Sequence, residues 1–408
     1  MAVEIKKIDQ GSVTSPPGFR AAATTAGIKP SGNPDVGLLL SEVPCTAAGL
    51  FTTNQLKGES MRLTMQRVAD GRAQGLLVNS GVANACTGIT GRKDALTLTR
   101  IAANGLGLLP KDILPNSTGV IGNRLPMDLL KQALPNLLNG LDESGGPAFA
   151  QAMMTTDTVP KFSAREVNVD GTRFILGGAA KGAGMIFPRM ATMFGFMTTD
   201  APVEVEALRL FLRTACDASF NRLTIDGDTS CCDTVLVLAN GMEGGEPIRP
   251  DDGPRARAFQ EALTCLCREL TFRLAHDGEG VHHVVTIRVD RAQAREHALQ
   301  VARSIALSPL VKTAIHGCDP NWGRIVNAAG YSGAPFFAKR ATLCIGDIEV
   351  FRHGCRTDFD EDEVHRLMQQ REYDIRLSLN LGEASDFVIT TDFSKEYVDI
   401  NADYAHRT

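Results

Sequence analysis

The irregular order of strand-like and helix-like stretches is the feature that most restricts the fold of this chain. Residues 75–88 and 233–241 carry the short apolar runs typical of buried strands. Residues 202–220 and 254–278 place apolar side chains at helical spacing. A doubly wound parallel sheet requires strict alternation of strand and helix, and this chain lacks that alternation. We therefore predict an α/β fold with mixed β-sheets layered with helices.

Turn residues and helical spacing predict three more features of the fold. The N-terminus is expected to form an exposed arm, followed by short strands within residues 18–29 and 35–53, where glycine, proline and asparagine separate the apolar runs. Asp170 and Gly171 predict a hairpin turn between two strands. The spacing of apolar residues predicts one helix over residues 295–317.

Composition excludes several classes of protein. The 408 residues carry a formal net charge of -5, which gives no basic surface for nucleic acid. Every long apolar run is broken by proline, glycine or charge, and the N-terminus lacks the apolar core of a signal peptide. The ten cysteines are scattered without paired CxxC units. We expect a soluble, cytoplasmic globular protein with reduced thiols that binds neither nucleic acid nor a membrane.

A single threonine in the apolar segment MIFPRMATMFGF (residues 185–196) is the first candidate for catalysis. A threonine hydroxyl is a weak nucleophile unless a base removes its proton, and the neighbours of Thr192 supply none. Cleavage before Thr192 would expose an α-amino group with a pKa of about 7.7 to 8.0, a suitable base. The small side chain of Ala191 leaves its carbonyl open to attack. The alternative is a buried strand with a structural threonine.

Three further stretches contain residues suited to binding charge. In NSTGVIG (116–122), backbone N–H groups and the Thr118 hydroxyl could hold a negative oxygen, although an ordinary capped turn has the same composition. GGAAKGAG (177–184) lacks the phosphate-loop pattern, so Lys181 is better suited to a carboxylate, unless the run is a flexible surface loop. Glu279 in HDGEG could bind an amine, or it is a solvated charge in a turn.

Seven motifs taken together resemble the ornithine acetyltransferase family, also called bifunctional glutamate N-acetyltransferase, of arginine biosynthesis. The motifs are KGAGMIFPRMATM, STGVIG, MTTDTVPK, DGEG, DPNWGR, GYSG and INADY. The resemblance extends from about Pro17 to the C-terminus. It implies self-cleavage between Ala191 and Thr192, into an α fragment (1–191) and a β fragment (192–408) that stay associated, as a heterotetramer of two α and two β fragments.

The same resemblance implies ping-pong transfer of an acetyl group from N2-acetylornithine to glutamate, through an ester on Thr192. Thr118 and Gly119 would stabilise the tetrahedral oxyanion, and no cofactor, metal or acetyl-CoA is needed for the exchange. The implied substrate contacts, with Thr156 as the alternative to Thr155, are Thr155, Lys181, Thr192, Glu279, Asn401 and Thr408.

The sequence departs from the family pattern at positions that bear on the substrate. The departures are Val82, Cys231, Cys232, Val281, His282, His283 and the terminal AHRT. They leave open a relative that acts on another acyl-amino acid, or an amidohydrolase with water as acceptor. A non-catalytic member retained for binding is the third alternative, which the presence of Thr192, Thr118 and Gly119 disfavours.

Overall fold

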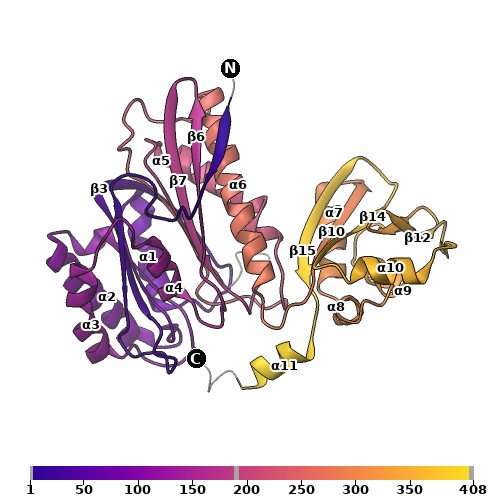
Figure 1. Cartoon of the computed structure of the whole chain (residues 1–408), viewed down its shortest axis with the longest axis horizontal. Helices are drawn as coiled ribbons and strands as arrows, with labels where there is room; N and C mark the ends of the chain where they lie inside the picture. Colours follow the sequence, from indigo (N-terminus) through magenta and orange to yellow (C-terminus); the bar gives the residue numbers. More distant parts are fainter. Residues whose placement is uncertain (1–2, 188–192, 404–408) are drawn as a thin grey trace.

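The computed structural model describes residues 3–187 and 193–403. In these residues the chain forms a nine-stranded sheet and a separate six-stranded sheet, each accompanied by helices (Figure 1). Both sheets contain parallel and antiparallel pairs. The predicted α/β class with mixed sheets layered with helices is therefore confirmed.

The large sheet has the strand order β1-β6-β7-β8-β9-β3-β4-β5, and β2 pairs with β3 outside this path. Its strands are β1 (Glu4–Ile8), β2 (Phe19–Thr24), β3 (Val36–Phe51), β4 (Arg72–Asn79), β5 (Ile113–Ser117), β6 (Lys161–Val169), β7 (Thr172–Lys181), β8 (Phe194–Thr199) and β9 (Thr234–Ala239). Strands β8 and β9 lie in the middle of this sheet, between β7 and β3.

Helices cover both faces of the large sheet (Figure 1). They are α1 (Glu59–Arg67), α2 (Gly88–Leu106), α3 (Met127–Asn139), α4 (Gly146–Met153), α5 (Val205–Asp217) and α6 (Pro254–His276), with short 3-10 turns at Val68–Asp70, Pro110–Asp112 and Phe220–Arg222. The sequence of strand β9 (TVLVLA) shows why both faces of the sheet are covered. Val235 and Val237 enter the core under α5 and α6, while Leu236 and Leu238 enter the core on the opposite face. A strand buried on both faces needs an uninterrupted apolar sequence.

The N-terminal strands differ from the prediction in two respects. Residues Glu4–Ile8 do not form the predicted exposed arm, because they pair with β6 at the edge of the sheet. The short strands expected within residues 35–53 form one 16-residue strand, β3. Its pairing with β4 shifts register between Leu40 and Cys45, and Pro44 lies in that shift, where a missing N–H is tolerated. Strand β3 therefore continues through Pro44, although the sequence predicts that proline separates two short strands here.

The predicted hairpin turn is confirmed between β6 and β7. Asp170 and Gly171 have φ values of 50° and 81°, the positive values that a tight turn of this kind requires. The hairpin brings Lys161 opposite Ala180 at its open end, so the two strands deliver Lys161 and Lys181 to the same region.

The smaller sheet has the order β13-β12-β11-β14-β10-β15. Its strands are β10 (Val284–Ala292), β11 (Thr342–Ile345), β12 (Ile348–Arg352), β13 (Cys355–Arg356), β14 (Glu372–Ser378) and β15 (Ala384–Thr391), accompanied by α7 (Arg295–Ala306), α8 (Pro309–His316), α9 (Trp322–Gly330) and α10 (Glu361–Met368). The single helix predicted over residues 295–317 is wrong. Ser308 caps a new helix and Pro309 begins it, so α7 and α8 are separate.

Helix α11 (Lys395–Ala402) follows β15 and lies at the bottom of the view in Figure 1, below and between the two sheets. It contributes no buried residue of its own. Across the described ranges, no helix is long and apolar enough to cross a membrane.

Candidate active site

A cavity of about 300 Å³ contains most of the residues that the sequence analysis selected. Six of them line it: Thr118, Gly119, Thr155, Lys181, Glu279 and Asn401. Thr156, the alternative to Thr155, lines it as well. Ala191, Thr192 and Thr408 lie outside the described residues.

The turn after β5 presents Thr118 and Gly119 to the cavity. The Thr118 N–H donates to the Asn79 carbonyl at 3.0 Å, and the Val120 N–H donates to the Gly81 carbonyl at 3.1 Å. Gly119 has φ +130°, and a Cβ there would lie 2.3 Å from the carbonyl carbon of Gly81. This position therefore requires glycine, because any side chain would push the turn away from the backbone that supports it.

Lys181 ends β7 and is buried, with 3% of its surface exposed. Its ammonium group donates to the Thr118 hydroxyl at 3.1 Å and to the Thr155 hydroxyl at 3.0 Å. Burial lowers the pKa of Lys181, while the carboxylate of Asp157 acts in the opposite direction. Because the Thr118 oxygen accepts from Lys181, its own proton remains available to a group in the cavity.

A buried ion network supports this wall of the cavity, and sequence reasoning missed it. Asp157 accepts from the Lys161 ammonium at 2.6 Å and from the Gly182 N–H at 2.7 Å. Burial opposes ionisation of Asp157, but Lys161 and Lys181 outweigh it and hold its pKa below the usual range. Asp277 also pairs with Lys161. The sequence pattern that could have indicated this network is MTTDTVPK, which contains Asp157 and Lys161. Only the fold shows that both side chains are buried.

Glu279 and Asn401 form a second wall of the cavity. Glu279 is 6% exposed, and its carboxylate accepts a hydrogen bond of 2.7 Å from the Asn401 amide. The Glu279 N–H donates to the Ala183 carbonyl at 2.9 Å, and a Cβ at Gly184 would lie 2.4 Å from the Glu279 carboxylate. The glycine run thus lets an acid approach the backbone closely. The cavity has a cationic group and an anionic group, an arrangement suited to an amino acid.

The chain returns beside Lys181 at the start of β8. Phe194 pairs with Lys181 in the sheet, and the Met193 N–H donates to the Asp233 carboxylate at 2.9 Å. Asp233 is buried, and burial raises its pKa well above the usual range. Thr192 therefore directly precedes two residues that are held next to the lysine of the cavity. The role of Asp233 as an anchor was not predicted, because its partner is a backbone group 40 residues away.

Two departures from the family pattern belong to this cavity. Cys231 and Cys232 both line it, with their sulfur atoms 3.4 Å apart. The hydrogen bond from the Cys232 thiol lowers the pKa of Cys231 to about 7, whereas the pKa of Cys232 is raised. Val82 pairs with Val120 behind the Thr118–Gly119 turn. These departures therefore lie in the lining of the cavity or behind it, and they do not replace Thr118, Gly119 or Lys181.

The remaining departures lie elsewhere or outside the described residues. The backbone N–H groups of His282 and His283 both donate to Asp392, at 2.7 and 2.9 Å. Neither histidine lines the cavity. Residues 404–408, including AHRT, lie outside the described ranges.

Comparison with known proteins gives a consistent set of similarities. The ArgJ family model matches residues 20–406. The arginine biosynthesis bifunctional protein ArgJ of Dehalococcoides mccartyi (strain CBDB1) is 45% identical over 406 residues, which cover 99% of this chain and 100% of the relative. The protein of the same name from Thermosynechococcus vestitus is 43% identical, covering 97% and 98% respectively.

Solved structures show local similarity. The ornithine acetyltransferase of Mycobacterium tuberculosis, crystallised in complex with ornithine, is 37% identical with a TM-score of 0.43. The match covers 47% of this chain and 100% of that chain.

Proposed function

The chain belongs to the ArgJ family of bifunctional arginine-biosynthesis acetyltransferases, and we propose that its cavity moves an acetyl group from N2-acetylornithine to glutamate through an ester on Thr192. The observation that carries this proposal is the convergence in one cavity of the Thr118–Gly119 turn, Lys181 and Glu279. These residues come from distant parts of the chain and have the charges that an amino-acid substrate requires.

In the proposed reaction, cleavage of the peptide bond after Ala191 supplies Thr192 with a free α-amino group. That amine takes the hydroxyl proton as the Thr192 oxygen attacks the acetyl carbonyl. The tetrahedral intermediate collapses by breaking the amide C–N bond, and ornithine leaves with the proton. The amine of glutamate then attacks the ester carbonyl, and the ester C–O bond breaks. A proton from that amine passes to the Thr192 oxygen, which restores the hydroxyl, and N-acetylglutamate leaves.

Thr118 and Gly119 are proposed to hold the oxyanion in both half-reactions. The Thr118 hydroxyl already accepts from Lys181, so its proton is free to donate to the oxyanion. A donor of this kind contributes about 3 kcal/mol, or two to three orders of magnitude in rate. We assign Lys181 and Thr155 to the substrate carboxylate and Glu279, with Asn401, to an ammonium group. Thr408 completes the proposed set.

The order of strands supports the proposal that the two fragments stay together after cleavage. Strands β8 and β9 belong to the proposed β fragment (192–408), yet β7 and β3 on either side belong to the α fragment (1–191). Separation would break two strand pairings and open the core under α5 and α6. We propose that two such αβ units form the heterotetramer. All ten cysteines are free, which fits the proposed location in the reducing cytoplasm.

The proposal is tested with wild-type protein, Thr192→Ala and Thr192→Ser. We expect two polypeptides from the wild type, one of them beginning Thr-Met-Phe, and acetyl transfer only when N2-acetylornithine and glutamate are both present. Thr192→Ala should remain one chain without activity, whereas Thr192→Ser keeps a hydroxyl and retains part of both reactions. A cleaved, active alanine variant contradicts the proposal. Acetyl release that does not depend on glutamate would indicate the amidohydrolase alternative.

A further inference from the structure

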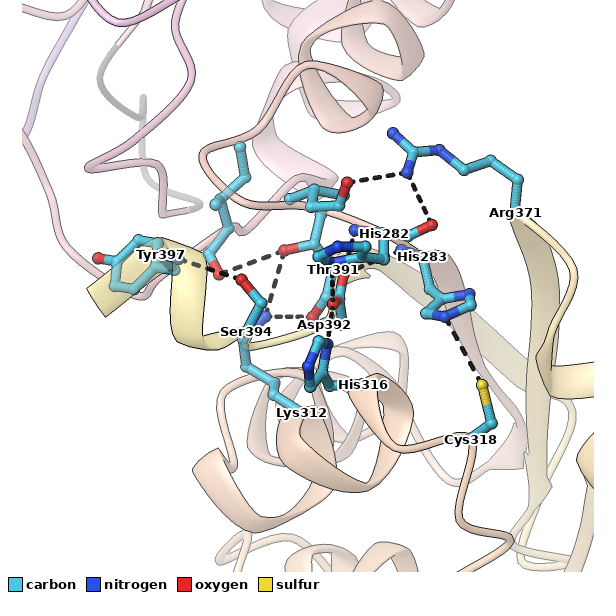
Figure 2. A network of polar contacts seen from close by, with 12 residues as sticks. His282, His283, Lys312, His316, Cys318, Arg371, Thr391, Asp392, Ser394 and Tyr397 are labelled. Carbon is cyan, nitrogen blue, oxygen red and sulfur yellow. Dashed lines mark hydrogen bonds and ion pairs between the residues drawn. The ribbon is translucent and has the colours of Figure 1, made fainter. Parts of the chain in front are cut away.

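Outside the cavity, two histidines and an aspartate from three separate segments meet at one point (Figure 2). His282 lies just before β10, His316 ends α8, and Asp392 follows β15. One Asp392 oxygen lies 3.2 Å from Nδ1 of His282 and 2.8 Å from Nδ1 of His316. One ligand atom from each residue lies within 4.8 Å of the other two.

The local hydrogen bonds hold Asp392 in a fixed orientation. Its Oδ1 atom accepts the backbone N–H groups of His282 and His283, which leaves Oδ2 directed at the two imidazole rings. The Asp392 side chain is fully buried, whereas those of His282 and His316 are 48% and 37% exposed. A ligand from solvent can therefore reach the imidazoles, and the carboxylate behind them supplies the negative charge.

We propose that His282, His316 and Asp392 bind a divalent transition-metal ion, with Zn²⁺ as the best match and water completing the coordination. Two imidazole nitrogens and a carboxylate oxygen are a common ligand set for zinc, with bonds of about 2.0–2.2 Å. Tetrahedral coordination at that bond length separates the ligand atoms by about 3.4 Å. The His282 and His316 separations from Asp392, 3.2 and 2.8 Å, are about 0.2 and 0.6 Å shorter than this value. The two exposed rings must therefore move outward by up to about 0.6 Å to admit the ion.

The ammonium group of the nearby, buried Lys312 does not occupy the position proposed for the metal ion. The Lys312 ammonium donates to the Thr391 carbonyl and to the hydroxyls of Thr390 and Thr391. Burial lowers the pKa of Lys312 to about 8, although Asp392 opposes the shift. Because Lys312 directs its protons at the threonines, the Asp392 oxygen that faces the imidazoles remains available to the metal ion.

The ion would connect the two segments that carry Glu279 and Asn401. His282 follows Glu279 by three residues, and Asp392 lies two residues before Ser394, which caps α11. Helix α11 has no buried residue and is held by few contacts, among them Asn401 to Glu279 and Tyr397 to Asp226. The bound ion therefore stabilises the position of α11 at the cavity and should lower KM for the amino-acid substrate. Only this effect on KM rests on the proposed function.

Titration of the chelator-treated, full-length protein with Zn²⁺ tests the site without measuring acetyl transfer. Isothermal calorimetry with wild type, His282→Asn and His316→Asn gives stoichiometry and affinity, and Co²⁺ gives a visible absorption spectrum that reports its coordination. His353→Asn is the matched control, since His353 is an exposed histidine far from the cluster in sequence, at φ +53°, where asparagine is well tolerated.

We expect each of the two ligand variants to lose one equivalent of bound ion, or at least tenfold in affinity, while His353→Asn binds like the wild type. Zn²⁺ that binds to any of the buried thiols would still bind in all variants, so such binding can be distinguished from binding at His282, His316 and Asp392. Equal stoichiometry and affinity in the wild type and both ligand variants would overturn the proposal, as would the absence of micromolar binding to the wild type. Both substituted side chains are partly exposed, so the variants are expected to fold.

Discussion

The two walls of the cavity are built differently. Thr118 and Lys181 extend from strands of the large sheet and are 5% and 3% exposed, above a network of buried ions. Glu279 and Asn401 belong instead to the connection between the sheets and to α11, a helix without buried residues. Groups that stabilise charge must be held rigidly before the reaction begins, whereas groups that select a substrate can tolerate movement. We therefore expect changes at the oxyanion group Thr118 in the first wall to affect kcat, and changes at Glu279 and Asn401 in the second wall to affect KM.

Among the substitutions in the two walls, Thr118→Ala is expected to have the largest effect on kcat. Loss of the hydroxyl removes one oxyanion donor and leaves the Lys181 ammonium with one partner fewer, so kcat should fall by about 100- to 1,000-fold. Thr118→Ser is the control, because it keeps the donor and should lose less than tenfold. Steady-state kinetics on both variants measure the difference. A change in KM with an unchanged kcat in Thr118→Ala would contradict the expected difference between the two walls.

Lys161→Met tests whether the buried ions make the first wall rigid. The substitution leaves Asp157 and Asp277 without their shared cation and should lower the free energy of unfolding by about 3–5 kcal/mol. Lys131→Met, an exposed lysine on α3 near Asp128, should change it by less than about 1 kcal/mol. Urea unfolding of the two variants gives the values. Equal stabilities would show that the network contributes nothing.

Glu279→Gln should raise KM for the amino-acid substrates by about ten- to a hundredfold, with kcat within a few-fold of the wild type. The amide keeps the shape of the side chain but loses the charge that attracts an ammonium group. Initial rates over a range of glutamate concentrations measure both constants. A fall in kcat at saturating substrate would place Glu279 with the reacting groups instead.

The thiol pair of Cys231 and Cys232, which also lines the cavity, gives a pH-dependent test. A Cys231 pKa of about 7 means that the thiolate fraction rises about tenfold from pH 6 to pH 8, and alkylation by iodoacetamide should accelerate to the same extent. Because Cys231 lines the cavity, its modification should abolish activity. Cys231→Ser should remain active after the same treatment, although the exposed Cys86 and Cys355 still react. Inactivation of that variant would place the sensitive thiol elsewhere.

Asn401→Ala should have the smallest effect, a rise in KM of a few-fold. The amide orients Glu279 with one hydrogen bond of 2.7 Å, and removal of one such bond from a half-exposed site changes binding by about 1 kcal/mol. Double-variant kinetics with Glu279→Gln should show that the two effects are not additive. Full additivity would mean that Asn401 acts independently of Glu279.

Local sequence patterns predicted the secondary structure around the site but not the long-range supports. The turn at Asp170–Gly171 follows from backbone geometry that these two neighbouring residues determine, whereas the need for glycine at 119 comes from the distant Gly81 backbone. The division of α7 from α8 could have been predicted from Ser308 and Pro309, but the apolar spacing on both sides concealed it. The pairing of Lys161 with Asp277 joins residues 116 positions apart, and no local pattern specifies such a contact.

By itself, the sequence determined the mixed α/β class, the chemical types of the candidate residues and the motifs that identify the family. Those properties depend on neighbouring residues and on order along the chain. Only the tertiary structure decided that Thr118, Lys181, Glu279 and Asn401 share a cavity, that the two cysteines line it, and that His282, His316 and Asp392 meet. The reason is that β8 and β9 enter the middle of a sheet made from earlier strands, so spatial neighbours are set by strand order and packing.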